Sequence, residues 1–196
     1  MKFYKMTLFA IVIAVMLCTF TFAQTEVRQS VQEPKGTTMD LVPFTPKMIG
    51  FPFSIQYPAK WYAREEFAGA PSLFLTQEPV RQVTDQYRVG LGLYVMLGVL
   101  NSLAGESTTQ NWEKNKNELV NGLEDQHFKI IDRQDVKISG QSALRVDCES
   151  VKARMINYYI KVNNNLFTMT LECPPQEYEQ YKQVFDEMLK SFTFTR

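Results

Sequence analysis

The only histidine of the chain, His127, lies close in sequence to three acidic residues, Glu124, Asp125 and Asp132. Histidine and carboxylate side chains can hold a metal ion, but zinc sites use several His or Cys ligands at short, regular spacings. This chain has no second histidine and no Cys-x-x-Cys pair. We therefore predict no metal site and no cofactor, and we interpret these residues as a charged surface near the end of a helix.

A second candidate for chemistry is Ser142. The run Gly140–Leu144 reads Gly-Gln-Ser-Ala-Leu, which matches the first half of the Gly-x-Ser-x-Gly turn of serine hydrolases. The second glycine is absent, and the only histidine precedes the serine, whereas those enzymes place their histidine after it. We predict an ordinary turn that leads into a strand.

Two further patterns also fall short of a catalytic or cofactor site. Gly90-x-Gly92 lacks the third glycine of a dinucleotide-binding loop and does not open a predicted helix. Glu65 and Glu66 are adjacent, so on a strand or a loop their side chains point apart and cannot act as a paired acid and base, and we predict that they belong to a solvated loop. These residue types and spacings therefore predict a protein that is not an enzyme.

The N-terminus has the pattern of a secretory signal. Two lysines precede an apolar run over residues 6–22, and Ala23 is followed by the polar Gln24. We predict a signal peptide over residues 1–23, cleaved between Ala23 and Gln24, and export to the periplasm or the extracellular space. The run approaches the length that spans a bilayer, so an uncleaved anchor is the alternative. We expect membrane contact only through the uncleaved precursor.

Charge excludes one class of partner. The chain has 21 basic and 21 acidic residues, so its formal net charge is zero. A neutral domain without a basic stripe has no long-range field that would collect a polyanion. We expect no nucleic-acid partner.

Composition divides the rest of the chain in two. Residues 24–45 are polar and include Pro34 and Gly36, which predicts a flexible linker. Residues 46–196 are predicted to form one α+β domain. Apolar alternation predicts strands at 51–57, 72–76, 87–99, 129–132, 135–138, 143–148, 154–162 and 166–173, and apolar residues at three- and four-residue steps predict helices at 107–124 and 175–190.

The strands near the C-terminus predict a hairpin with a defined register. Asn163 and Asn164 form a two-residue turn, because Asn tolerates the positive φ that such turns need. Pairing of Val162 with Asn165 then sets Ile160 opposite Phe167. The same register sets Tyr158 opposite Met169 and Ile156 opposite Leu171, so that every apolar side chain lies on one face.

Two cysteines, Cys148 and Cys173, remain after removal of the leader. Exported proteins usually oxidise such a pair. The hairpin register, however, places one cysteine on each side of Arg154, two strand spacings or roughly 9–10 Å apart. A disulfide spans at most about 7 Å between Cα atoms. We therefore predict two buried, reduced thiols on the core face of the sheet.

Three motifs occur in a characteristic order: Phe53-Ser-Ile-Gln-Tyr-Pro-Ala-Lys-Trp61, Ile138-Ser-Gly-Gln-Ser-Ala143, and the closing set Tyr181, Phe185, Leu189 and Phe192. In these motifs the chain resembles the PsbP family, within the superfamily that includes the Mog and DcrB-like proteins, as an exported member of bacterial type. The resemblance covers about residues 51–194. It implies a central antiparallel β-sheet flanked by helices, an α/β/α sandwich. It also implies a non-enzymatic protein that binds and stabilises a larger protein assembly.

Two functions follow from these features. The first is a non-catalytic exported module that binds a partner protein or an envelope assembly. Its candidate residues are the neighbouring aromatic side chains Trp61, Tyr62 and Phe67, since aromatic clusters often dominate protein interfaces. The alternative for Trp61 is a place at the end of the core.

The second function is a carrier or sensor of a small apolar ligand, held in a cleft between the sheet and a helix. Its candidate lining is Gly90, Gly92, Tyr94, Leu100 and Leu103, because the glycines allow a close approach to the backbone. An enclosed apolar cavity of about 300 Å³ or more would favour this function over the first.

Overall fold

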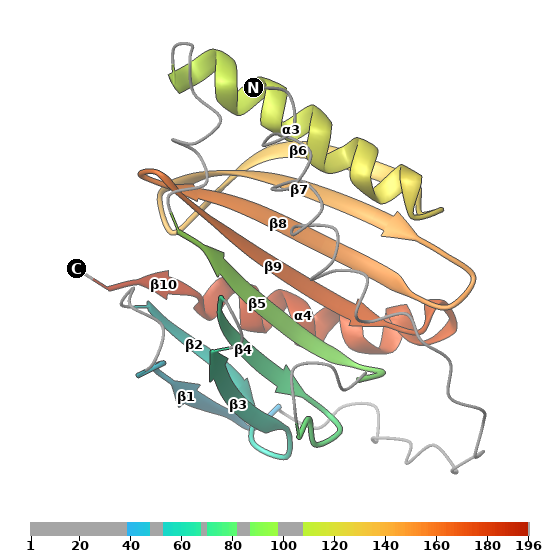
Figure 1. Ribbon diagram of the computed structural model, residues 1–196. Coiled ribbons are helices and arrows are strands. Elements are labelled where there is room, and N and C mark those ends of the chain that lie inside the picture. The colour runs from blue at the N-terminus through green and yellow to red at the C-terminus, as the bar shows by residue number, and fades with distance from the viewer. Residues whose placement is uncertain (1–38, 48–52, 68–69, 82–86, 98–107, 196) are drawn as a thin grey trace.

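A computed structural model describes residues 39–47, 53–67, 70–81, 87–97 and 108–195, with side chains from Trp112 onward in the last range. Its centre is a seven-stranded antiparallel sheet with the order β3-β4-β5-β9-β8-β7-β6 (Figure 1). The strands are β3 (Tyr62–Phe67), β4 (Pro71–Thr76), β5 (Gly90–Met96), β6 (Lys129–Ile138), β7 (Gln141–Glu149), β8 (Arg154–Val162) and β9 (Asn165–Cys173).

The two described helices cover opposite faces of this sheet. Helix α3 (Thr108–Asp125) packs over β6 and β7, and we name that side the α3 face. Helix α4 (Tyr178–Ser191), which follows a 3₁₀ turn at Pro175–Glu177, lies on the other side, the α4 face. A small sheet of order β1-β2-β10 adds to the cover on the α4 face. Its strands are β1 (Leu41–Phe44), β2 (Phe53–Pro58) and β10 (Thr193–Phe194).

This arrangement confirms the predicted fold class, an α+β sandwich around an antiparallel sheet. Neither α3 nor α4, the helices of the described part of the chain, is long and apolar enough to cross a membrane.

Each face of the sheet has its own apolar core. On the α4 face, Leu91 and Phe167 pack with Phe185 of the helix. On the α3 face, Val146 packs with Trp112. The separation follows from the alternation of side chains along a strand, which sends neighbouring residues into different cores.

Helix α3 is also held to the sheet by charge. The Lys116 ammonium is almost fully buried, and its Nζ lies 2.7 Å from carboxylate oxygens of both Glu113 and Asp135. Burial alone would lower the pKa of Lys116, but the two carboxylates raise it, so the lysine stays charged.

The predicted hairpin register is confirmed. Val162 pairs with Asn165, Ile160 with Phe167 and Ile156 with Leu171. Asn163 has a φ of 53°, as the tight turn requires. Ser139 and Gly140 also have positive φ, 48° and 81°, and connect β6 to β7, so the segment before Ser142 is a hairpin turn.

The structure differs from the predicted elements in several places. Residues 62–67 and 193–194, for which no strand was predicted, form β3 and β10. Strand β1 lies within the predicted linker 24–45, so the ordered part begins before residue 46. Its Pro43 has no N–H to donate, which suits an edge strand but weakens the sequence signal. Residues 129–138 form one strand rather than two, because the polar residues Arg133 and Gln134 between the predicted pieces also pair with β7. A bulge lies between Ile130 and Asp132 and does not end the pairing.

Tyr87 is a further difference. Strict alternation along the predicted strand 87–99 places Tyr87 on the same face as the apolar Leu91, but β5 begins only at Gly90. The Tyr87 hydroxyl instead lies over Gly92, on the α3 face.

Both cysteines are buried free thiols, as predicted. Their placement differs from the prediction, because Cys148 belongs to the α3-face core and Cys173 to the α4-face core. The backbone of the sheet therefore separates the two sulfur atoms. Burial is the main cause that raises the pKa of each thiol to about 12, so neither forms a thiolate readily.

We expect Phe185→Ala to lower the free energy of unfolding by about 3–5 kcal/mol, because the ring is fully buried between α4 and the sheet. Urea denaturation followed by circular dichroism measures the change. Val151→Ala is the matched control, since Val151 is fully exposed and should change stability by less than about 0.5 kcal/mol. Equal midpoints for wild type and Phe185→Ala would contradict this assignment.

We expect two labelled thiols per mature chain when the protein is denatured without a reductant and treated with a maleimide. Mass spectrometry counts the labels, and a sample reduced before labelling serves as the control. A count of zero in the unreduced sample would mean that the two cysteines are bridged and that the strand register is wrong.

Candidate functional site

The three aromatic residues predicted to bind a partner do not form one surface. Trp61 is only 8% exposed and packs in the α4-face core, with its ring centroid 6.4 Å from that of Tyr181. It therefore occupies the alternative position considered for it, at the end of the core.

Tyr62 and Phe67, in contrast, are 52% and 63% exposed. They lie at the two ends of β3 and on opposite faces of the sheet, since Tyr62 pairs with Thr76 and Phe67 with Pro71. Strand β3 is an edge of the seven-stranded sheet and, among the described strands, pairs only with β4. We call the outer side of β3, with Tyr62 and Phe67, the β3 edge.

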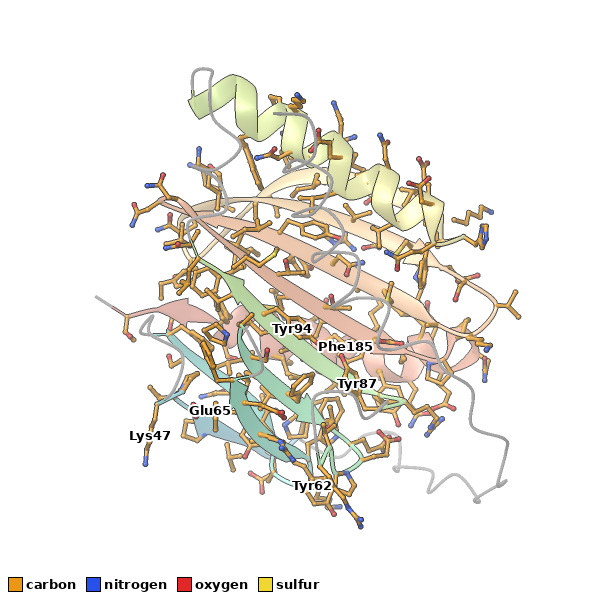
Figure 2. All side chains as sticks on the ribbon, in the orientation of Figure 1. Lys47, Tyr62, Glu65, Tyr87, Tyr94 and Phe185 are labelled. Carbon is orange, nitrogen blue, oxygen red and sulfur yellow. The ribbon has the colours of Figure 1, made fainter. Side chains whose placement is uncertain are left out.

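The charged residues of β3 lie between these two aromatic side chains. The backbone N–H of Lys47 donates to both carboxylate oxygens of Glu65, at 3.1 and 3.0 Å (Figure 2). The Glu66 carboxylate lies 3.0 Å from the Arg64 guanidinium. The loop predicted for Glu65 and Glu66 is wrong, because both residues lie on β3. Their side chains point apart, as expected, so the two carboxylates have different partners and do not form an acid–base pair.

A second group of charged residues lies on the α4 face, at the far side of the sheet. Asp147 is buried, with one carboxylate oxygen 2.8 Å from Arg145 and 3.7 Å from Arg154. Arg154 also lies over the ring of Tyr178, 4.7 Å from its centroid. Burial raises the pKa of Asp147, and the two arginines act against that rise. The charges compensate one another, so we assign this group to the stability of the sheet.

Polar and aromatic side chains also gather on the α3 face of β5 and β9. Gly90 pairs with Glu172, Gly92 with Thr170 and Tyr94 with Thr168. We call this group, together with Tyr87, the β5–β9 cluster; its members are Tyr87, Gly90, Gly92, Tyr94, Thr168, Thr170 and Glu172. Strands β8 and β9 separate β5 from β7, over which α3 packs.

The protein's own atoms fill the space over both glycines of the cluster. A Cβ at Gly90 would lie 2.6 Å from the Thr76 methyl carbon and 2.7 Å from the Leu75 carbonyl oxygen. A Cβ at Gly92 would lie 2.8 Å from the Tyr87 hydroxyl. Glycine is therefore required at both positions for close packing.

The hydroxyls of both tyrosines lie beside Gly92. The Tyr87 hydroxyl lies 2.8 Å and the Tyr94 hydroxyl 3.8 Å from the position that a Cβ at Gly92 would take. Both rings contact Phe74 edge to face, with centroid distances of 6.2 Å for Tyr87 and 5.7 Å for Tyr94. Contact with Phe74 thus holds both rings on the α3 face, with their hydroxyls beside Gly92.

Glu172 is the only ionisable acid of the β5–β9 cluster. It is half-buried, and no cation in the described part of the chain pairs with its carboxylate. Burial raises its pKa to about 7. Burial also raises the pKa of Tyr94 to about 12 and that of Tyr87 well above its usual range, with the Glu172 charge as the next cause in each.

The hydroxyls along β9 differ in their bonding. Thr170 Oγ1 donates to Asn157 Oδ1 at 2.8 Å, and Asn157 Nδ2 donates to Cys148 Sγ at 3.4 Å. Thr168 is 3% exposed, and its Oγ1 has no hydrogen-bond partner. A buried hydroxyl without a partner destabilises the fold by about 1–3 kcal/mol, so an additional polar group at this position would be favourable.

Three of the residues predicted to line a ligand cleft are thus brought together. Gly90, Gly92 and Tyr94 share the α3 face, whereas Leu100 and Leu103 lie outside the described residues. The surroundings differ from the prediction, because the glycines lie beyond the part of the sheet that α3 covers and their neighbours are polar.

Sequence reasoning missed Glu172 and Thr168. The signal was available in the polar residues that alternate with the apolar residues of β9, but such alternation usually means exposure to solvent. Within the described residues, no three His, Cys, Asp or Glu side chains come together to hold a metal ion.

We expect the stability of the wild-type protein to fall as the pH rises from about 4.5 to 7. The folded state keeps the Glu172 proton up to about pH 7, whereas the unfolded chain releases it near 4.5, so folding is favoured at acid pH and the advantage is lost above 7. The loss is at most about 3 kcal/mol. Glu172→Gln should remove this part of the pH dependence in urea titrations from pH 4.5 to 8, while the exposed control Glu124→Gln should retain it. Parallel curves for wild type and Glu172→Gln would contradict the assignment.

The comparisons with known proteins concern the fold alone. No protein-family model and no curated protein matches the chain. The solution structure of cyanobacterial PsbP (CyanoP) from Synechocystis sp. PCC 6803 matches with a TM-score of 0.55 and 12% sequence identity, over 84% of this chain and 98% of that chain. PA94, a protein of unknown function from Pseudomonas aeruginosa, matches with a TM-score of 0.49 and 14% sequence identity, over 82% of this chain and 99% of that chain. LpqN of Mycobacterium tuberculosis, described as involved in cell envelope biogenesis, matches with a TM-score of 0.44 and 12% sequence identity, over 83% of this chain and 88% of that chain. The CyanoP match agrees with the motifs of the sequence: the chain has a PsbP-like α+β fold.

Proposed function

We propose that the protein is a non-catalytic module that is exported to the periplasm or the extracellular space and binds a partner protein or an envelope assembly through the β3 edge. The observation that carries this proposal is the exposure of two large aromatic side chains, Tyr62 and Phe67, on one edge strand. The leader sequence supports export.

An edge strand offers backbone N–H and C=O groups to an extended segment of another chain, which can add to the sheet as a further strand. On β3, Tyr62 projects from one face and Phe67 from the other, so the two rings could contact an added strand on both sides. Large aromatic side chains at such positions often supply most of the binding energy.

The opposite edge of the sheet is less suited to this role. Strand β6 carries the bulge between Ile130 and Asp132, and bulges hinder the addition of a further strand. The ion pair of Arg64 with Glu66 on β3 is formed within the strand itself, so a partner strand needs no matching charge there.

A second candidate function, binding of a small ligand, is favoured by the β5–β9 cluster. The unpaired carboxylate of Glu172 and the unsatisfied hydroxyl of Thr168 are the specific observations. Their polarity argues against the apolar ligand predicted from the sequence.

We expect a photo-cross-linking residue at position 62 or 67 to trap the same protein in the native envelope. Position 151 is the control, because Val151 is fully exposed and lies between β7 and β8, which β4, β5 and β9 separate from β3 in the sheet. With the purified partner, Tyr62→Ala and Phe67→Ala should each weaken binding at least tenfold, or about 1.4 kcal/mol. Val151→Ala should leave the Kd unchanged.

Two results would refute the proposal. One is an adduct that forms equally from positions 62, 67 and 151. The other is a partner whose affinity is the same for wild type and both aromatic variants.

A further inference from the structure

The β5–β9 cluster contains a negative charge without a counter-charge. Glu172 is half-buried, and no cation in the described part of the chain forms an ion pair with it. An uncompensated buried carboxylate is costly, and a cation placed beside it removes much of that cost. The cluster therefore favours a positively charged ligand.

The arrangement of hydrogen-bond acceptors restricts the kind of cation. The hydroxyl oxygens of Tyr87 and Tyr94 lie beside Gly92, and Glu172 lies on the neighbouring strand, opposite Gly90. Both tyrosines stay protonated, so each oxygen can accept a hydrogen bond. A primary ammonium group has three N–H donors, which matches one carboxylate and two hydroxyls.

A metal ion fits the same site less well. Hard cations such as Ca²⁺ and Mg²⁺ take six or more oxygen ligands, usually with more than one carboxylate. The β5–β9 cluster offers one carboxylate, and no group of three metal-binding side chains exists among the described residues.

We infer that the β5–β9 cluster binds a small protonated primary amine, with Glu172 as the counter-charge and the Tyr87 and Tyr94 hydroxyls as hydrogen-bond acceptors. The tyrosine rings contribute a further attraction to the cation. Tyr87, Tyr94 and Glu172 are all partly exposed, so solvent reaches the site.

The affinity should depend on pH in a defined direction. The ligand needs the charged carboxylate, and Glu172 loses its proton near pH 7. The other titratable groups that Glu172 influences are Tyr87, Tyr94, Cys148 and Cys173, and burial raises the pKa of each far above this range. Binding should therefore tighten about tenfold from pH 6 to pH 8.

Isothermal titration calorimetry of the mature protein tests the inference with four probes. Ethanolamine and 1,4-diaminobutane represent free amines, and Nα-acetyl-lysine methylamide represents a lysine side chain of another protein. Tetramethylammonium has the charge but no N–H donor. We expect saturable binding of the free amines at pH 8, weaker binding of the lysine probe, and no binding of tetramethylammonium.

Variants connect the binding to the named residues. Glu172→Gln should weaken binding more than tenfold and remove its pH dependence, and Tyr94→Phe should weaken it several-fold. The control Glu124→Gln, on the exposed side of α3, should bind like wild type. Loss of the buried charge should not unfold the protein, and a thermal midpoint of Glu172→Gln at or above that of wild type at pH 8 verifies this.

The inference is overturned if no primary amine binds, if Glu172→Gln binds as tightly as wild type, or if tetramethylammonium binds as well as ethanolamine. Tighter binding of the lysine probe than of the free amines would still support an ammonium-binding site. It would show that the ammonium group comes from a lysine side chain of another protein. None of these outcomes depends on the β3 edge, so this site and the proposed partner surface are tested separately.

Discussion

Both cores of the molecule depend on the alternation of side chains along the meander β7-β8-β9. On β7, Leu144, Val146 and Cys148 enter the α3-face core, while on β9 Phe167 and its alternate neighbours enter the α4-face core. A shift of the register by one residue would reverse every side chain and expose both sets to the wrong face. The docking of both helices therefore rests on a single pairing pattern.

That pairing pattern explains how much of the fold can be predicted from the sequence. The β8–β9 hairpin is predictable residue by residue, because a tight turn and one apolar face leave only one register. The short strands β1 and β10 are not, since a strand of two to four residues carries too little alternation to recognise. Tyr87 shows the limit within a long strand, since periodicity alone placed its ring with Leu91, whereas the chain bends before Gly90 and turns it to the other face.

The candidate sites divide in a similar way. Tyr62 and Phe67 could be selected from the sequence as exposed aromatics, but their separation onto two faces follows only from the pairing of β3 with β4. Gly90 and Gly92 were recognisable as positions of close approach. Their partner Glu172 was not, because a polar residue in an alternating strand is normally solvated, and its burial depends on neighbouring strands that lie far away in the sequence.

The position of the two cysteines has a consequence for the biogenesis of the chain. Each thiol is enclosed on its own side of the sheet, so the finished fold offers no route to a disulfide between Cys148 and Cys173. Folding of the sheet therefore needs no catalyst that forms a bond between these two residues. A Cys148–Cys173 bond can form only before the meander has assembled. Detection of that bond would therefore identify chains that were oxidised before they reached the native state.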